Sequence, residues 1–285
     1  MAGRTGATAP VRQHGRRRRR RIDWLPILIS IASVIIVFGA VAYFVSRAEQ
    51  WPRIKLQFFS WEAMKESFPD VLRGFWVNVE IWVICIISIG LWALVLTLFR
   101  ILSGPWFAPL RIFAIVYVDL FRGIPALLLV FLLGFGVPAL QIPGLPTSAV
   151  FWGAVAMTLS YAAYATEVYR SGIESVHEGQ SAAAKALGLT QLQAMRYAIL
   201  PQALRNVLPA LLNLTIALQK DVALLSALGV RDAVQEARNY SFLEFNYSSL
   251  VVAAVLFLIT TIPLARLVDY LTARDRRRRL QGGTA

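Results

Sequence analysis

The 285-residue chain is too apolar for a soluble protein. Hydrophobic residues make up 57% of it and charged residues only 16%, whereas a soluble domain is about one quarter charged. Much of the positive charge behind the net charge of +13 lies in two arginine runs, Arg16–Arg21 and Arg276–Arg279. These runs lack the interleaved aromatic or polar residues of a protein that binds nucleic acid. The single cysteine, Cys85, excludes an internal disulfide, and no Cys/His spacing indicates a metal site. The composition indicates an integral membrane protein.

Six segments are apolar enough to cross a bilayer as helices, which takes about 20 residues each. The first, Trp24–Ser46, carries no charge. The uncharged stretch from Gly123 to Thr166 is too long for one helix, and three prolines and a glycine within residues 137–148 predict a turn that divides it. The sequence therefore predicts an all-α integral membrane protein. Its expected spans are residues 24–46, 74–99, 112–136, 149–167, 206–230 and 245–265.

The segments outside these spans complete the expected organisation. Residues 1–23 and 272–285 are basic tails, residues 47–73 link the first span to a transmembrane domain of residues 74–271, and residues 168–204 form that domain's long loop. Within the linker, four apolar residues recur at helical spacing: Trp61, Met64, Phe68 and Leu72. The spacing fits either a short amphipathic helix on the membrane surface or a linker that happens to be patterned.

The distribution of lysine and arginine predicts the orientation of the spans. Cytoplasmic segments carry an excess of these residues. With the N-terminus inside, the inner segments hold 19 of the 29 lysines and arginines and the outer segments hold 7. We therefore expect both termini and loop 168–204 to be cytoplasmic, and the linker 47–73 to be extracellular.

The first span also has features of a signal peptide. An arginine-rich start and an apolar run are followed by Ala40-Val41-Ala42, a small-residue pattern like a cleavage site. A run of 23 apolar residues is longer than the usual signal core, which favours a retained membrane anchor.

Loop 168–204 reads as a short helix, a break and a second helix. The alanine-rich stretch Ser181–Leu187 favours a helix, and Gly188 can take the positive φ that ends one. Thr190 is placed to cap a helix over residues 191–200, and Pro201 marks the turn into the fifth span. Small alanine side chains would let another protein approach the helix closely. The loop fits equally well an amphipathic helix that rests on lipid headgroups.

Several motifs of the chain resemble a known family. Ala182-Ala183-Ala184, Gly188 and Ile199-Leu200-Pro201 resemble the EAA loop of ABC-importer permeases. Five further segments narrow the resemblance to the polar amino-acid permeases, and they are Y-V-D-L-F-R-G-I-P-A-L-L-L-V-F (117–131), A-T-E-V-Y-R-S-G-I (165–173), Gly179-Gln180, L-P-Q-A-L-R (200–205) and K-D-V-A-L-L-S-A-L-G-V (220–230). Together they cover roughly residues 70–272.

The resemblance implies a five-helix permease core plus one N-terminal transmembrane helix, and a loop that couples the core to a separate ATPase subunit. By resemblance, the coupling residues are Gly179, Gln180, Ala182, Ala183, Ala184, Gly188, Leu189, Ile199, Leu200 and Pro201. The family's motif glutamate is Ala182 here, so an ion pair made by that glutamate is absent, and Glu178 one turn earlier could replace it. The chain has no phosphate-binding G-x-x-x-x-G-K-[ST] loop, so ATP and Mg²⁺ are expected on the partner.

Ionisable residues inside spans are costly and are therefore candidates for function. Asp119 and Arg122 lie three residues apart on one helix face, which allows an ion pair, and Pro125 is expected to kink the span. Arg122 fits a simple anchor at the headgroups, whereas the resemblance implies a role in gating or in helix packing. The resemblance also places Glu167 among the candidates for the substrate path or its gate.

Lys220 and Asp221 lie deep in the fifth span, where adjacent side chains point about 100° apart, so one of them is expected to face the bundle interior. The pair fits an amino acid's two charges, or a buried charge that ties two helices together. Glu80 lies six residues into the second span and fits either an outer vestibule or the interface.

The combined expectation is a multi-pass plasma-membrane subunit of an ATP-driven ABC importer for polar amino acids, without catalytic residues or cofactors of its own. Its expected partners are an ATPase dimer, a second permease subunit that is the same chain or a sibling, an extracellular solute-binding protein and membrane lipid. A secondary transporter is the alternative, although neither a repeated half nor matched broken helices appear in the sequence. An intramembrane enzyme is disfavoured because no nucleophile–base or metal motif joins Glu80, Asp119 and Asp221.

Overall fold

The computed structural model describes residues 24–102 and 104–282, and all regular elements in this part of the chain are helices. The chain divides into two units between Pro52 and Arg53. The first unit contains α1 (Trp24–Ser46), an uncharged helix of 23 residues with the bounds expected of the first span. α2 (Trp51–Phe58) crosses the division. The basic tail expected at residues 1–23 lies outside the described residues.

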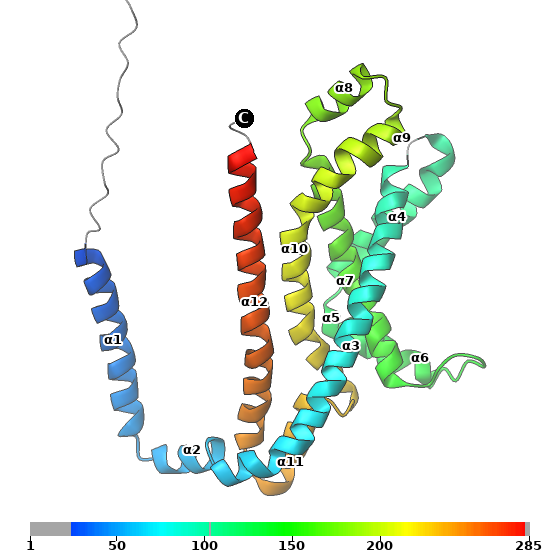
Figure 1. Ribbon diagram of the computed structural model, residues 1–285. Coiled ribbons are helices and arrows are strands. Elements are labelled where there is room, and N and C mark those ends of the chain that lie inside the picture. The colour runs from blue at the N-terminus through cyan, green and yellow to red at the C-terminus, as the bar shows by residue number, and fades with distance from the viewer. Residues whose placement is uncertain (1–23, 103, 283–285) are drawn as a thin grey trace, which may run out of the picture. The chain divides into compact units, whose positions relative to one another are not determined.

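Four long helices form the framework of the second unit: α3 (Trp61–Ile101), α7 (Ala149–Glu174), α10 (Leu200–Asp221) and α12 (Ser248–Gly282). α3 and α10 each contact both α7 and α12, and Figure 1 shows the four helices side by side. α8 (Glu178–Ala186) and α9 (Gln191–Ala194) lie at one end of this bundle, and α11 (Ala233–Glu244) lies at the other (Figure 1). The remaining elements are η1 (Pro105–Phe107), α4 (Ala108–Gly123), α5 (Ala126–Gly134), α6 (Gly136–Ala139), η2 (Met195–Ile199) and η3 (Val222–Leu228).

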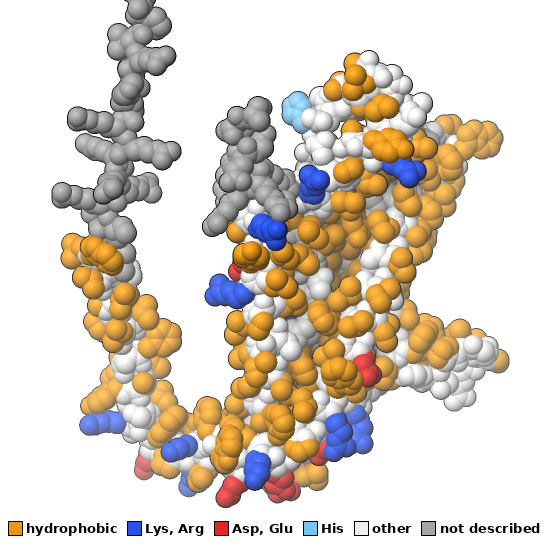
Figure 2. Space-filling view, viewed as in Figure 1, with side chains coloured by type: hydrophobic (Ala, Val, Ile, Leu, Met, Phe, Trp, Pro, Cys, Tyr) orange, Lys and Arg blue, Asp and Glu red, His pale blue; other side chains and the backbone are white. Residues whose placement is uncertain are grey.

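Small and apolar side chains fill the core of the bundle where α3, α7, α10 and η3 meet. Cys85, Ala93, Met157, Ala162 and Leu225 are completely buried there. On the face seen in Figure 2, hydrophobic side chains cover the flanks of the helices, and most charged side chains lie toward the two ends. An apolar flank between two charged ends is the surface that a bilayer requires.

Five described helical segments are long and apolar enough to cross a membrane, and a bent helix pair adds a sixth. This number agrees with the six expected spans. The kink expected at Pro125 in the third span, 112–136, is a sharp break, because η1 and α4 meet α5 and α6 at an angle of 102°. The break falls at Ile124–Pro125, where Ile124 is extended with φ −88° and ψ 129°. A proline disfavours helical geometry in the residue before it, which explains why α4 ends there.

The second span begins earlier than expected. α3 starts at Trp61, where the Ser60 side chain accepts a hydrogen bond from the Ala63 N–H at 3.4 Å, and it continues through Pro69 to Ile101. Of the two alternatives for the spacing of Trp61, Met64, Phe68 and Leu72, the helix is therefore the one observed, as the first part of a long helix rather than as a short separate one. Trp61, Met64 and Phe68 line an apolar groove against α12.

The last span also differs from the expected bounds of 245–265. It starts at Ser248, after Phe245 has taken a left-handed conformation with φ 50° at the end of α11. α12 then stays helical to Gly282, so the segment expected as a basic tail at 272–285 is largely a continuation of the helix.

The buried carboxylate of Asp232 joins α3 to the start of α11, at the end of the bundle opposite α8. Asp232 is completely buried, and its side chain accepts hydrogen bonds from Asn78 of α3 at 3.0 Å and from the Gln235 N–H at 2.9 Å. Burial raises the pKa of Asp232, and these hydrogen bonds oppose the rise. Gly74 packs against the backbone of Asp232 so closely that a Cβ there would collide with backbone atoms.

We expect Gly74→Ala to destabilise the protein by about 1–3 kcal/mol, because backbone at this contact has no flexible side chain that can move aside. Gly90→Ala is the matched control in the same helix, since a Cβ there meets nothing within 4 Å. The control should be neutral or slightly stabilising, because alanine favours a helix over glycine by about 1 kcal/mol. Unfolding of the two variants in detergent, followed by circular dichroism, measures the difference, and equal stabilities would contradict the packing described here.

Candidate functional site

The loop between α7 and α10 is built from local hydrogen bonds. His177 caps the start of α8, and its Nδ1 accepts a hydrogen bond from the Gly179 N–H at 3.0 Å. Gly188, two residues after the end of α8, has φ +82°. The Gly188 N–H donates to the Lys185 carbonyl at 2.9 Å and the Leu189 N–H to the Ala184 carbonyl at 3.1 Å, the two bonds of a Schellman turn. The helix expected at Ser181–Leu187 and its glycine stop are therefore confirmed.

The second half of the loop starts with a reciprocal cap. The Thr190 side chain accepts from the Gln193 N–H at 3.3 Å, and the Gln193 side chain accepts from the Thr190 N–H at 2.8 Å. α9 then passes into η2, a π-helical turn of the kind often found at functional sites, and directly into α10. The helix is thus continuous through Pro201, and the turn expected at that residue was wrong: Pro201 follows the π-helical turn as the second residue of α10.

Two contacts connect this loop to the bundle. The Gln202 side chain of α10 donates to the Gln180 side chain of α8 at 3.2 Å, and the Asn206 side chain of α10 donates to the Ser175 hydroxyl at the end of α7 at 2.8 Å. Gly172 of α7 lies directly against Val207 of α10, where any side chain would collide. A force applied to α8 would therefore reach α10 and α7.

The loop presents small and apolar side chains at its surface. Of the ten expected coupling residues, Ala184 is buried, Leu189 and Ile199 are half-buried, and Gly179, Gln180, Ala182, Ala183, Gly188, Leu200 and Pro201 are exposed. Leu187 is 82% exposed, Leu192 79% and Tyr197 66%. These three residues were not among the predicted coupling residues, although a leucine next to the helix-ending glycine was a usable signal. Exposed apolar side chains beside an alanine face form a surface that another protein can bury.

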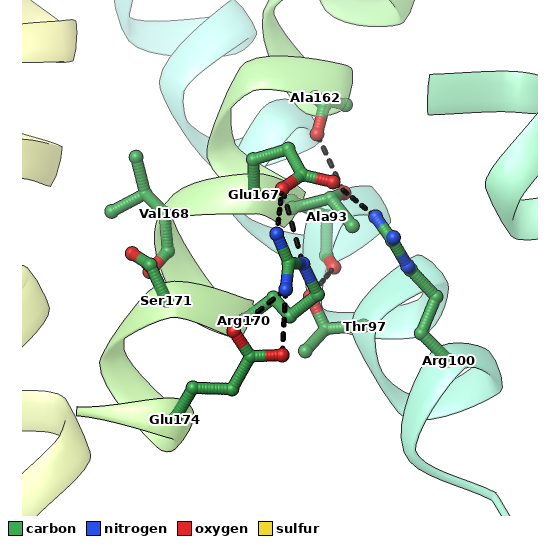
Figure 3. Close-up of polar contacts among 10 residues, drawn as sticks. Ala93, Thr97, Arg100, Ala162, Glu167, Val168, Arg170, Ser171 and Glu174 are labelled. Atoms are coloured by element: carbon green, nitrogen blue, oxygen red, sulfur yellow. Dashed lines mark hydrogen bonds and ion pairs between the residues drawn. The ribbon is translucent and has the colours of Figure 1, made fainter. Parts of the chain in front are cut away.

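An ion network joins the ends of α3 and α7 near this loop (Figure 3). Glu167 accepts from Arg100 of α3 and from Arg170 of its own helix at 2.7 Å, and Arg170 also contacts Glu174 at 2.6 Å. The side chains of Arg100 and Glu167 are only 17% and 19% exposed. Both oxygens of the Glu167 carboxylate are occupied, so in this structure the residue fastens two helices together.

The structure separates the two charges of the fifth span. The Asp221 carboxylate points into the bundle and accepts a hydrogen bond from the Tyr161 hydroxyl of α7 at 2.5 Å, whereas Lys220 is exposed. Tyr161 also lines a cavity of about 180 Å³ between α3, α7 and α10, together with Gly90 and Thr215. Sequence reasoning did not identify Tyr161, because its partner lies 60 residues away.

The other candidates in the spans do not meet this pair. Glu80, Asp119 and Arg122 are exposed. Arg122 lies over the Tyr164 ring at 5.6 Å, and the ion pairs among the described residues do not include the Asp119–Arg122 pair that the spacing allowed. Pro125 follows the 102° break.

A polar contact that was not predicted from the sequence joins α10 to α12, where the Gln219 side chain bonds to Thr260 at 3.0 Å and to Thr261 at 2.6 Å. In the described part of the chain, no group of His, Cys, Asp and Glu side chains could hold a metal ion.

Comparisons with known proteins agree with this architecture. Residues 101–277 match the family model described as "Binding-protein-dependent transport system inner membrane component". The chain is 32% identical over 222 residues to the glutamate/aspartate import permease protein GltK of Escherichia coli O157:H7, covering 76% of this chain and 98% of GltK. It is 33% identical over 200 residues to the arginine transport system permease protein ArtQ of Bacillus subtilis, covering 70% of this chain and 89% of ArtQ.

Solved structures share the fold. The crystal structure of an amino acid ABC transporter with histidines aligns with a TM-score of 0.70 at 28% identity, covering 75% of this chain and 98% of that one. The MetNI methionine ABC transporter in an inward-facing conformation aligns with a TM-score of 0.60 at 20% identity, a likeness of fold alone. The chain belongs to the family of binding-protein-dependent transport system inner membrane components.

Proposed function

We propose that this chain is the membrane-spanning subunit of an ATP-driven importer of amino acids, and that α8 and α9 couple it to a separate ATPase. The observation that carries the coupling role is the surface of this loop. Exposed alanines lie on α8 and Leu187 lies at its end, which a Schellman turn closes. A side-chain hydrogen bond joins α8 to α10, and Leu192 is exposed on α9. A docking helix needs a low, rigid surface, and the exposed alanines and the Schellman turn of α8 support docking.

The coupling role implies the partners. Two ATPase subunits would bind ATP and Mg²⁺ and receive α8 from each of two permease subunits, and a solute-binding protein would deliver substrate at the opposite end, near α11. This arrangement places the loop and both termini in the cytoplasm, in agreement with the excess of lysine and arginine on that side. ATP hydrolysis then belongs to the partner, because the sequence lacks a phosphate-binding loop.

The proposed substrate class rests on the relatives. GltK is named for glutamate and aspartate and ArtQ for arginine, so the substrates named for these relatives share the amino-acid backbone and differ in side-chain charge. We assign this chain to amino acids as a class.

ATP-dependent uptake tests the proposed function. The chain is purified from its native membrane together with the ATPase and binding protein that accompany it, and the complex is reconstituted into proteoliposomes. Uptake of a mixture of radiolabelled amino acids should require ATP on the side of α8. Uptake that continues without ATP and follows an ion gradient would support the secondary-transporter alternative instead.

We propose that Glu178 replaces the glutamate of the family motif, whose position Ala182 takes in this chain, and supplies its negative charge to the ATPase contact. Glu178 and Ala182 lie four residues apart on one face of α8, and both are exposed. We expect Glu178→Gln to weaken binding of the ATPase subunit by about fivefold, the effect of about 1 kcal/mol, and the double variant Glu178→Gln, Ala182→Glu to recover it. The amount of ATPase that co-purifies with each variant measures this. Failure of the double variant to recover binding would remove Glu178 from the coupling surface.

The substrate path is proposed to include Asp221 and Lys220, with Glu80, Arg122 and Pro125 as gate or vestibule residues. Asp221 is held by Tyr161 beside the cavity between α3, α7 and α10, and Lys220 is exposed on the other face of α10, where a second subunit could meet it. A carboxylate and an ammonium at one level of the path would complement the two charges of an amino acid.

We expect Asp221→Asn to lower uptake by about tenfold, because a charged hydrogen-bonding group contributes about 1.5–3 kcal/mol. Lys220→Met should change the uptake rate or the substrate profile without loss of ATPase binding. Lys55→Met in α2 is the matched control and should leave both unchanged. Initial uptake rates for acidic, basic and neutral amino acids provide the measurement. An unchanged profile in both span variants would limit Asp221 and Lys220 to structural roles.

A further inference from the structure

The path from α8 to the membrane-spanning part of α10 runs through a π-helical turn. α8 packs against α9 and η2, and Ala184 of α8 and Ala194 of α9 are both buried. α9, η2 and α10 then follow one another without a break in the chain (Figure 1). A displacement of α8 therefore reaches α10 by way of η2.

Pro201 explains why the helix widens at this point. In an α-helix the N–H of residue 201 would donate to the carbonyl of Tyr197, but a proline has no N–H, and its ring collides with that carbonyl. One residue earlier, the Leu200 N–H donates to the Met195 carbonyl, five residues back instead of four. The wider turn makes room for the proline ring and interrupts the regular α-helical bonds just before α10.

An interruption of this kind makes η2 a place where the helix can yield. A π-turn holds one residue more than a regular turn. A return to α-helical bonds would turn the preceding segment by about 100° around the helix axis and shift it by about 1.5 Å. Unless the turn is held, a displacement of α8 can be taken up within η2 and does not reach α10.

The Gln202 side chain of α10 holds this turn. Its Nε2 donates to the Ala198 carbonyl of η2 at 3.0 Å and to the Gln180 side chain of α8 at 3.2 Å. The Ala198 carbonyl can only accept, so the nitrogen of the Gln202 amide must face it, and Gln180 presents its oxygen. The amide nitrogen carries two hydrogens, one for each acceptor. One side chain of α10 therefore fastens both η2 and α8, and it does so as a donor.

We propose that Gln202 is a positioning residue that makes α8, η2 and α10 move as one body. Displacement of α8 by the ATPase then shifts α10 instead of being absorbed in the π-turn. This inference rests on the proposed coupling role of α8. Gln202 acts through α8 and η2, so its loss separates ATP hydrolysis from uptake without removing the ATPase contact.

The ratio of ATP hydrolysed to solute taken up tests this role. The complex of the chain with its ATPase and binding protein is reconstituted into proteoliposomes, and both rates are measured. Gln202→Leu removes the donor and should raise the ratio about fivefold, the effect of a hydrogen bond of about 1 kcal/mol. Gln202→Glu keeps the shape of the side chain but can only accept, so it should raise the ratio equally. Gln202→Lys keeps N–H donors and should hold the ratio within about twofold of the wild type.

Gln180→Glu is the matched control for Gln202→Glu. It adds the same charge to the same contact but keeps the acceptor that Gln202 needs, so its ratio should stay near the wild-type value. The ratio is compared instead of the uptake rate, because Gln180 also belongs to the expected coupling surface. An unchanged ratio in Gln202→Leu, or an equal rise in the two glutamate variants, would overturn the role of Gln202 as a donor.

Hydrogen exchange in the full chain alone tests the bracing independently of any ATPase. In mild detergent, Gln202→Leu should speed exchange of the α8 and η2 amides about fivefold, because the bonds that oppose local opening are lost. Gln57→Leu, an exposed glutamine of α2, should leave these amides unchanged. If uptake proceeds without ATP, the proposed function fails. Faster exchange in Gln202→Leu would then still support the bracing of α8 by Gln202, and unchanged exchange would overturn it.

Discussion

Replacing Gly188 with proline is expected to abolish ATP-driven uptake while the chain still inserts in the membrane. Gly188 has φ +82°, and its N–H donates to the Lys185 carbonyl. Proline can neither reach this φ nor donate, and the disruption of a helix by proline costs about 3 kcal/mol or more. The Schellman turn that shapes the end of α8 would open, and uptake should fall by about 100-fold.

Two controls make this result specific. Gly144 also has a positive φ, +88°, with open space around it, but it lies in the loop between α6 and α7, so Gly144→Pro should retain uptake. Gly188→Asn keeps the N–H and tolerates the left-handed conformation, so it should retain most of the activity. Wild-type uptake by Gly188→Pro would contradict the coupling role of the turn.

The second large effect is expected at the ion network of Figure 3. Glu167→Gln leaves Arg100 and Arg170 facing a neutral amide at a site where Arg100 is only 17% exposed. Removal of one partner from a largely buried pair leaves an uncompensated charge, and we expect a loss of about 2–3 kcal/mol in the free energy of unfolding. Unfolding of the detergent-purified protein with sodium dodecyl sulfate, followed by circular dichroism, provides the measurement.

Glu174→Gln is the matched control for this variant. It makes the same chemical change on the same helix and also removes a partner of Arg170, but the Glu174 side chain is 59% exposed. An exposed pair four residues apart contributes about 0.3–0.5 kcal/mol, so the control should lose far less stability. Equal losses in the two variants would show that Glu167 does not fasten α3 to α7.

The sequence was informative wherever a feature is set by neighbouring residues. Apolar runs located the spans, because a bilayer requires about 20 such residues wherever a helix crosses it. Gly188 and Thr190 ended and restarted the loop helices as expected, because caps are satisfied within one turn. The break at Pro125 was anticipated as a kink, but its angle of 102° was not. The angle depends on the helix against which α5 packs, and that helix, α7, begins more than ten residues after α5 ends.

Features set by distant residues were not accessible in this way. Tyr161 and Asp221 are 60 residues apart, Arg100 and Glu167 are 67 apart, and Gln219 and Thr260 are 41 apart. A single sequence shows which polar residues lie in spans but not which helix faces meet. The same limit explains Asp119 and Arg122, whose spacing on one helix permitted an ion pair, although in the folded bundle Arg122 lies over the Tyr164 ring.

We predict that α8 docks on a separate ATPase subunit, and purification from the native membrane tests this docking most directly. The tagged chain is extracted in mild detergent, and every protein that co-purifies is identified by mass spectrometry. We predict an ATPase subunit in wild-type preparations and in Gly144→Pro, and its loss in Gly188→Pro. If the wild-type chain is recovered without an ATPase and still takes up solute without ATP, the account is contradicted and the chain acts as a secondary transporter.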